Sequence, residues 1–332
     1  MSGAEYQFWM GGRLATHLEE VTDDPERLND GNFWAVVISF EGRRTFARFS
    51  HIGFQPFPQN SWNPLRGGWK SSLSRDEYIS YVAEIREEIA RGGVYQVNAC
   101  RTLSHELNRE NEHLAGLFNA LQARNPAPYA LYLNIPEIEI APASPDLFLL
   151  RDGLRLTTSP LKGTMREGAV NFGEKDKAEN LMIVDLMRND FGQISQSGSV
   201  EVSHLFRSEK HPGLTHLVSD VTGILRESVT WGEIFAAITP PGSVSGAPKS
   251  AALATIASTE GARGPYCGAI GWIQGDHAQI SVGIRIFWSE DSRTLHFGTG
   301  AGITWGSDPE QEWEETQLKA RRLISIAGGE LS

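Results

Sequence analysis

Residues 266–304 read YCGAIGWIQGDHAQISVGIRIFWSEDSRTLHFGTGAGIT, and this stretch decides the fold. It contains three apolar runs, 266–274, 278–288 and 294–304, with the β-branched and aromatic residues that strands prefer. Only a few polar residues separate one run from the next, which predicts hairpins. The stretch therefore favours a sheet built mainly from antiparallel strands.

Helical patterns surround this stretch. Ser74 and Glu77 form a capping box before apolar residues at helical spacing, and Gly92 and Gly93 end that helix. Pro309 in a first turn and a cap from Ser307 predict a C-terminal helix. Further segments are predicted as strands at 94–107 and 199–206 and as helices at 174–190, 231–238, 247–259 and 309–325. Because helices and hairpins are mixed without regular βαβ units, we expect an α+β fold.

The composition is that of a globular protein. Of 332 residues, 40% are hydrophobic and 21% are charged, and neither a membrane span nor a secretory signal is recognisable. Cys100 and Cys267 are the only cysteines, too few for a disulfide framework, so we expect a cytoplasmic location. The net charge of −11 argues against nucleic acid and membrane as partners. An anionic substrate would therefore need a pocket with its own cations or a metal ion.

Two predicted helices each carry a pair of carboxylates three residues apart. The pairs are Asp176 with Glu179 and Glu312 with Glu315, and this spacing places both members of a pair on one helix face. Two such faces turned together would suit a hard cation such as Mg²⁺. The simpler interpretation is that acidic residues near helix starts complement the helix dipole and stay solvated, and the spacing alone favours it.

Two glycine-rich segments resemble nucleotide-binding loops but differ in detail. The segment 298–302 lacks the third glycine of a dinucleotide fingerprint, and Pro248 occupies a glycine position of a P-loop in 242–250. A nucleotide site is therefore not expected. Backbone N–H groups in such loops still suit a carboxylate ligand.

Three further residues have a chemical and a structural interpretation. Lys162 lies among turn-forming residues in an expected loop. It is either a surface charge or, if it is buried near other cations, a neutral nucleophile. Arg285 lies between apolar neighbours of an expected strand, facing either a pocket or solvent. His216 fits a core histidine better than a catalytic one on pattern alone.

Nine motifs together resemble those of the chorismate-binding enzymes, which include anthranilate, aminodeoxychorismate, isochorismate and salicylate synthases. They occur in the family's order from about Trp62 onward: GGVYQVN, SPLKGT, KAENLMIVDLMRNDFG, THLVSDVTG, PPGSVSGAPK, RGPYCGAIGW, SVGIRIF, GTGAGI and EWEETQLKA. The resemblance implies a two-lobed α/β sandwich with large, mainly antiparallel sheets inside, helices outside and the site in the cleft.

The resemblance also implies a role for each candidate residue. Glu179 and Glu315 would ligate Mg²⁺, while Asp176 and Glu312 would hold its waters. His216 would face the reacting edge of the ring. The residues implied to anchor the substrate carboxylates or to line the pocket are Arg285, Tyr266, Lys319, Gly300, Ala301, Gly302, Ser245, Gly246 and Lys249.

Two positions indicate a branch of the family. Isochorismate and salicylate synthases carry a water-activating lysine where this chain has Gln96, which cannot act as a base. Anthranilate synthases carry a small residue where this chain has Lys162, as in the aminodeoxychorismate synthases. The resemblance thus implies an aminodeoxychorismate synthase component I, which makes 4-amino-4-deoxychorismate for 4-aminobenzoate and folate biosynthesis. Lys162 would attack C2 as the C4 hydroxyl leaves, and ammonia would then attack C4 and expel the lysine.

The chain departs from the family pattern in two places. Asp146 stands where the family has a glutamate as general acid, and it is one methylene shorter. We also expect a trimmed N-terminal lobe over 1–60, packed on a catalytic domain at 61–332, and no tryptophan feedback, since the tryptophan-binding motif is not found there.

Ammonia would come from a separate glutamine amidotransferase or be used directly. Two other functions stay open. One is another ammonia-using chorismate enzyme, such as anthranilate synthase component I. The other is a chorismate-binding protein without activity, suggested by Asp146. A nicotinamide dehydrogenase is disfavoured by the missing third glycine.

Overall fold

The computed structural model describes residues 6–107, 113–166, 172–211 and 214–331, of which 162–166, 174–175, 210–211 and 214 are described by their backbone alone. The helices are α1 Arg75–Ala90, α2 Leu114–Arg124, α3 Glu174–Gly192, α4 Trp231–Ile238, α5 Lys249–Thr259 and α6 Pro309–Ala327, with 3-10 helices η1 Pro25–Asp30 and η2 Gly242–Val244.

The strands follow in chain order. They are β1 Gln7–Met10, β2 Arg13–Thr22, β3 Phe33–Ile38, β4 Arg44–Phe54, β5 Leu65–Ser71, β6 Gln96–Glu106, β7 Leu131–Ile135, β8 Ile138–Pro142, β9 Leu147–Asp152, β10 Arg155–Ser159, β11 Leu161–Arg166, β12 Glu201–His211, β13 Leu214–Ile224, β14 Gly246–Ala247, β15 Ala269–Gln274, β16 His277–Val282, β17 Ile286–Ser289, β18 Thr294–Ile303 and β19 Gly328–Leu331.

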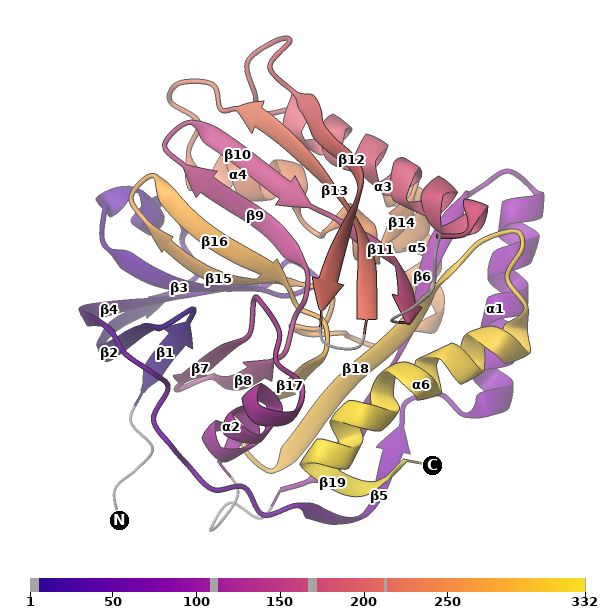
Figure 1. The fold of residues 1–332 in the computed structure, drawn as a ribbon, viewed down its shortest axis with the longest axis horizontal. Helices are drawn as coiled ribbons and strands as arrows, with labels where there is room; N and C mark the ends of the chain where they lie inside the picture. The colour runs from indigo at the N-terminus through magenta and orange to yellow at the C-terminus, as the bar shows by residue number, and fades with distance from the viewer. Residues whose placement is uncertain (1–5, 108–112, 167–171, 212–213, 332) are drawn as a thin grey trace.

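Backbone pairing follows one continuous antiparallel path through most strands. The path starts at β6 and passes through β18, β17, β8, β7 and β1. It turns back through β2, β4 and β3 and continues through β15, β16, β9, β10 and β13. Both β11 and β12 pair with β13, and β5 pairs in parallel with β19. The sheet therefore folds back on itself as a sandwich (Figure 1).

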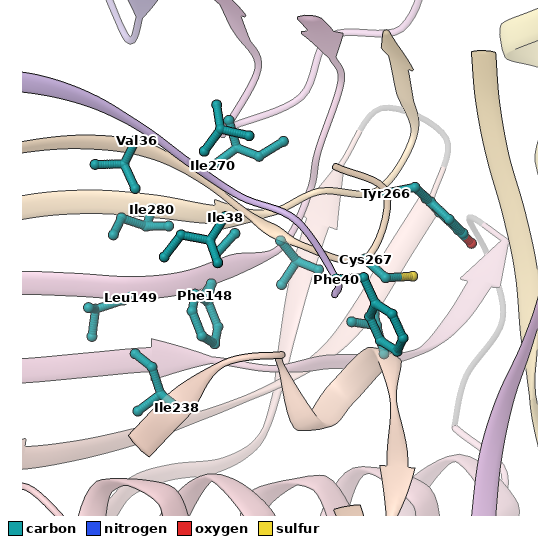
Figure 2. Packing of buried hydrophobic residues seen from close by; sticks show 14 of the residues in the cluster. Val36, Ile38, Phe40, Phe148, Leu149, Ile238, Tyr266, Cys267, Ile270 and Ile280 are labelled. Atoms are coloured by element: carbon teal, nitrogen blue, oxygen red, sulfur yellow. The ribbon is translucent and has the colours of Figure 1, made fainter. Parts of the chain in front are cut away.

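One apolar cluster joins the two halves of this sandwich. It contains Val97 of β6 and Leu133 of β7 together with Leu149 of β9 and Ile270 of β15. Figure 2 shows part of this core, with Ile38, Ile270, Ile280, Phe148 and Leu149 among the labelled side chains. Burial of these side chains is the main contribution to the stability of the fold.

The helices lie outside the sheets, as Figure 1 shows. Helices α1 and α6 pack on each other and on β6 and β18, and α2 packs on β8 and α6. Helix α3 packs on β11, β12 and β13 and touches α4. The predicted α+β class, the antiparallel sheet and the helices at 174–190, 231–238, 247–259 and 309–325 are confirmed.

Strands β1 to β4 belong to the same sheet as the rest of the chain. β1 pairs with β7 and β3 pairs with β15, both in antiparallel register. The expected packing of a trimmed lobe over residues 1–60 on a catalytic domain stays a prediction. The domain boundary at residue 60 stays a prediction.

Two expected strands have other bounds. The run 278–288 is interrupted between β16 and β17, and Arg285 lies in the interruption with φ +51°. A side chain at Gly283 would lie 2.1 Å from the Pro265 carbonyl oxygen, so two chain segments approach closely there. The expected strand at 266–274 begins at Ala269, because Tyr266 and Cys267 form a turn in which Cys267 has φ +63°.

Two local expectations are also wrong. Asp308, rather than Ser307, caps α6, since its Oδ1 accepts the Gln311 amide at 3.0 Å. Lys162 lies in strand β11 instead of a loop, because Leu161 and Thr164 on either side pair with Val218 and His216 of β13.

Candidate active site

Strand register brings several predicted site residues together around the start of β6. Gly300, Ala301 and Gly302 of β18 lie opposite residues 100, 99 and 98 of β6. On the other edge, Ala247 of β14 lies opposite Gln96. Gly246 has φ +145°, and a side chain there would lie 2.2 Å from the Gln96 carbonyl oxygen. Gln96, Gly246 and the 300–302 backbone therefore border one region.

Gln96 is the buried polar residue of this region. Its side chain is 1% exposed. Its Oε1 has no hydrogen-bond donor among the described residues. A buried acceptor without a donor costs about 1–3 kcal/mol, so the oxygen favours a ligand that carries N–H or O–H groups.

Asp146 and Arg285 form a second part of the site. Asp146 is 4% exposed, and its backbone is held on both sides: its N–H donates to Ser144 Oγ at 3.2 Å and its carbonyl accepts from Val282 N at 3.1 Å. Burial lowers the pKa of Arg285, the Asp146 carboxylate opposes that change, and Arg322 adds to it. The predicted acid and the predicted carboxylate anchor are therefore electrostatic neighbours.

Lys319 of α6 reaches the glycine-rich backbone of β18. Its Nζ lies 2.9 Å from the Gly300 carbonyl oxygen and 2.7 Å from Glu315 Oε1. Its side chain is half exposed. Lys319 and Arg285 are thus the cations among the predicted carboxylate anchors. A protein with a net charge of −11 needs such local cations to bind an anion.

Three predicted substrate contacts have protein partners. Lys249 Nζ pairs with Asp190 Oδ2 at 2.6 Å, and Ser245 Oγ donates to the Pro241 carbonyl at 3.0 Å. The Tyr266 hydroxyl accepts from Cys100 Sγ at 3.7 Å, and burial raises its pKa strongly. These polar groups already bond to other groups of the protein. Their contact with substrate stays a prediction.

The predicted metal-binding carboxylates lie on α3 and α6. Asp176 Oδ2 accepts the Gly173 N–H at 3.2 Å, so it caps α3, while Glu312 is buried and Glu315 pairs with Lys319. The described residues contain no group of three or more His, Cys, Asp or Glu side chains placed to hold a metal ion. The described residues alone thus do not provide a complete set of ligands for a metal ion.

The last two predicted catalytic residues are on neighbouring strands. His216 of β13 is buried, opposite Thr164 of β11 on one side and Glu209 of β12 on the other. Lys162 follows Leu161 on β11, and its side chain lies outside the described residues. The pairing of β11 with β13 brings the backbones of these two residues to adjacent strands.

A family model described as chorismate binding enzyme matches residues 43–325. The chain belongs to the chorismate-binding enzymes. Among its relatives, anthranilate synthase component 1 from Haloarcula marismortui is 35% identical over 272 residues, which are 77% of this chain and 54% of that protein. Aminodeoxychorismate synthase component 1 from Escherichia coli is 32% identical over 339 residues, which are 94% of this chain and 74% of that protein. The chain spans about half the length of the first of these relatives.

Solved structures of chorismate enzymes share the fold. Anthranilate synthase component I from Streptococcus pneumoniae superposes with a TM-score of 0.82 at 20% identity, covering 98% of this chain and 93% of that one. The menaquinone-specific isochorismate synthase from Escherichia coli gives 0.78 at 18% identity, covering 97% and 88%. At these identities the likeness concerns the fold. No helix in the described ranges is long and apolar enough to cross a membrane.

Sequence reasoning missed two ion pairs of this chorismate-binding enzyme, one partly buried and one buried. Asp190 of α3 is the partner of Lys249, and Glu260 is the partner of Arg263. The second pair has i, i+3 spacing, which was a signal available in the sequence. The first pair joins residues 59 positions apart, which no local pattern could reveal.

Proposed function

We propose that this chain is an aminodeoxychorismate synthase component I, which converts chorismate and ammonia to 4-amino-4-deoxychorismate. Membership of the chorismate-binding enzymes limits the substrate class. The identity of Lys162 carries the choice within the family, since it stands on β11 beside the strand of His216. The similarity to the Escherichia coli aminodeoxychorismate synthase component 1 over 94% of this chain supports the same choice.

Gln96 supports a nitrogen nucleophile. Its buried Oε1 is an acceptor without a donor in the described chain, and an amide cannot remove a proton from water. Ammonia carries N–H groups that can donate to this oxygen. Gln96 would therefore hold ammonia near the ring without activating water as a competitor.

Asp146 would supply the proton that the leaving C4 hydroxyl needs. Lys162 Nζ forms a bond to C2 as the C4–O bond breaks, and the hydroxyl departs as water with the proton from Asp146. Ammonia then forms a bond to C4, the C2–N bond to Lys162 breaks, and the ring carries an amino group at C4. Arg285 and Lys319 would hold the substrate carboxylates during both steps.

Mg²⁺ is proposed as the cofactor. Its donor set would be all carboxylate oxygen, from Glu179 and Glu315 with Asp176 and Glu312 behind them, which suits this hard cation. Mg²⁺ usually takes one or two carboxylates and keeps waters and substrate oxygens as further ligands, so a complete protein cage is not required. When bound, the ion would neutralise charge on a substrate carboxylate.

A separate glutamine amidotransferase is proposed as the source of ammonia. The relatives named component 1 imply a second component in those proteins. For this chain, glutamine should support turnover only after an amidotransferase is added, whereas an ammonium salt should support it alone.

Anthranilate synthase component I is the second candidate. The Haloarcula marismortui relative with that name is 35% identical, slightly more than the aminodeoxychorismate relatives. In that case ammonia would attack C2 directly and Lys162 would have no covalent role. The product separates the two candidates.

Product analysis tests the proposal. The purified chain is incubated with chorismate, Mg²⁺ and an ammonium salt, and the products are identified by chromatography and mass spectrometry before and after aminodeoxychorismate lyase is added. We expect 4-aminobenzoate only after the lyase. Anthranilate formed without the lyase would overturn the proposal.

A trapping experiment tests the covalent step. Without ammonia, the intact mass of the wild type should rise by chorismate minus water, while Lys162→Ala should stay unmodified. A wild-type mass that does not change under chorismate and Mg²⁺ would contradict the covalent route.

A further inference from the structure

A buried ion pair lies directly behind the start of β6. Arg263 is 2% exposed, and its guanidinium makes two parallel hydrogen bonds to Glu260, Nε to Oε2 and Nη2 to Oε1, both at 2.7 Å. The same group packs over the Phe40 ring at 4.2 Å. Glu260 is as deeply buried as its partner. Such bidentate pairs combine strength with strict geometry.

The pair also bonds to backbone groups of two other segments. Arg263 Nη2 donates to the Asn98 carbonyl at 2.7 Å, and Nη1 donates to the Val244 carbonyl at 3.1 Å. Glu260 Oε1 accepts the Cys100 N–H at 2.9 Å and the Tyr81 hydroxyl at 3.0 Å. One ion pair therefore connects β6, the 242–247 loop and α1.

These bonds fall where β6 lacks a neighbouring strand. On that edge, β14 pairs with residues 96–97 and β5 pairs with residues 103–104. Within the described chain no strand pairs with residues 98–102 there. Unpaired backbone groups in a buried strand need other partners. The side chains of Glu260 and Arg263 supply them at Cys100 and Asn98.

We propose that the Glu260–Arg263 pair is a positioning element of the chorismate site. The pair takes the place of a missing strand at the edge of β6 and fixes that strand relative to the 242–247 loop. Gln96 lies two residues from Asn98, and Ser245 and Gly246 follow Val244. The guanidinium thus adds to the direct bonds between these two segments, which are the pairing of β14 with residues 96–97 and the Asn98 N–H bond to the Ser245 carbonyl at 2.9 Å.

Arg101 provides a matched comparison on the same strand. It is also 2% exposed, and it packs over the Trp313 ring at 4.2 Å and bonds to Thr316 Oγ1 at 3.1 Å. These contacts lie on α6, and Arg101 Nη1 also donates to Ser71 Oγ of β5 at 3.0 Å. Loss of Arg101 should therefore destabilise the protein without changing how β6 and the 242–247 loop face each other.

The inference rests on the proposed use of chorismate, and it is tested with Arg263→Lys, Glu260→Gln and the control Arg101→Lys. Lysine keeps the charge at 263 but cannot make four bonds in the guanidinium geometry. Chorismate consumption, KM, kcat, thermal stability and amide hydrogen exchange are measured on the full chain with Mg²⁺ and an ammonium salt.

We expect Arg263→Lys and Glu260→Gln to lower kcat/KM about 10- to 100-fold, because small displacements of reacting groups are costly. Amide exchange should become faster in residues 96–100 and 242–247 of Arg263→Lys. Arg101→Lys should lose comparable thermal stability yet keep wild-type amide exchange in residues 242–247, since its contacts with Trp313, Thr316 and Ser71 do not reach that loop. Faster exchange in residues 242–247 of Arg263→Lys but not of Arg101→Lys separates a positioning role from a general loss of stability.

Other outcomes overturn the inference. Arg263→Lys with wild-type kcat/KM would do so, as would an Arg101→Lys variant whose amide exchange in residues 242–247 rises as much as that of Arg263→Lys. A wild type that does not consume chorismate would instead refute the proposed function. In that case, unchanged exchange in residues 96–100 of Arg263→Lys would still refute the positioning role by itself.

Discussion

At the scale of single residues, Asp146 is the proposed proton donor of the site. Its carboxyl is buried next to Arg285, and its backbone is bonded to Ser144 and Val282. A shorter acid than glutamate therefore has little freedom to move toward the substrate. If Asp146 is the acid, the pocket has to place the ring of chorismate within reach of its carboxyl group.

The first prediction concerns the acid itself. Asp146→Asn keeps the size of the side chain but has no proton to give, so kcat should fall about 100-fold or more while chorismate still binds. Asp146→Glu keeps the acid and should retain measurable turnover. Both values come from chorismate consumption under saturating ammonium salt. An Asn variant as active as wild type would show that another group protonates the leaving hydroxyl.

A second prediction concerns pH and His296 of β18. Burial lowers its pKa, and Asp291 and Glu290 oppose this with smaller effects. Below about pH 6.5, the unfolded chain takes up a proton at this histidine before the folded chain does. The stability that is present above pH 6.5 is therefore lost as the pH falls toward the lower pKa of the folded state.

The measurement is the free energy of unfolding in urea at pH 7.5 and pH 5.5. Wild type should lose more stability between the two values than His296→Gln, which cannot titrate. All other titrating groups are common to both proteins and cancel in the comparison. Equal losses would mean that His296 has the same pKa in the folded and unfolded states.

At the scale of elements, strand β18 is a packing surface as well as the proposed border of the substrate site. A Cβ at Gly298 would lie 2.0 Å from Cγ of the Tyr266 ring, so the ring lies directly on the strand backbone. The turn at 266–267 can only pack there because position 298 has no side chain. The glycines of the GTGAGI motif thus have a steric role besides any contact with a substrate carboxylate.

Gly298→Ala should displace Tyr266 and destabilise the protein by about 1–3 kcal/mol, as overpacking in a core does. Gly306→Ala is the matched control, because nothing lies within 4 Å of a Cβ at that position. Urea denaturation of both variants gives the difference. Equal stability of the two variants would show that the Tyr266 turn can move without cost.

At the scale of the whole molecule, the proposed function requires an acidic protein to bind an anionic substrate. The net charge is −11, and the predicted carboxylate anchors include two cations, Arg285 and Lys319, the second already paired with Glu315. A divalent cation would change this local balance. The proposed metal dependence would therefore rest on the carboxylates of α3 and α6.

Removal of metal with a chelator should abolish turnover, and Mg²⁺ should restore it. Mg²⁺ with chorismate should also raise the melting temperature of wild type, because ligands that bind only the folded state stabilise it. Glu315→Gln should lose this shift, while Glu314→Gln, its exposed neighbour on α6, should keep it. Full activity in the presence of chelator would refute the metal site.

Much of the fold was predictable because its signals are local. The capping box at Ser74 and Glu77 predicts the start of α1, and the apolar pattern predicts α4 at Trp231–Ile238. The interruption at Arg285 was not predictable, because it depends on the approach of Gly283 to Pro265 from another segment. The choice of Asp308 over Ser307 as a cap could have been predicted, because Pro309 at the first helical position makes the residue before it the cap.

The sequence by itself determined the family, the class of fold and the set of residue types available for chemistry, because motif order and periodicity are carried by neighbouring residues. Only the tertiary structure decided which polar groups are already used. Lys249 is paired with Asp190, Ser245 with its own loop and Arg263 with Glu260, whereas Gln96 keeps an acceptor without a donor in the described chain. Strand register sets these partners between residues distant in sequence, and periodicity carries no information about register across the sandwich.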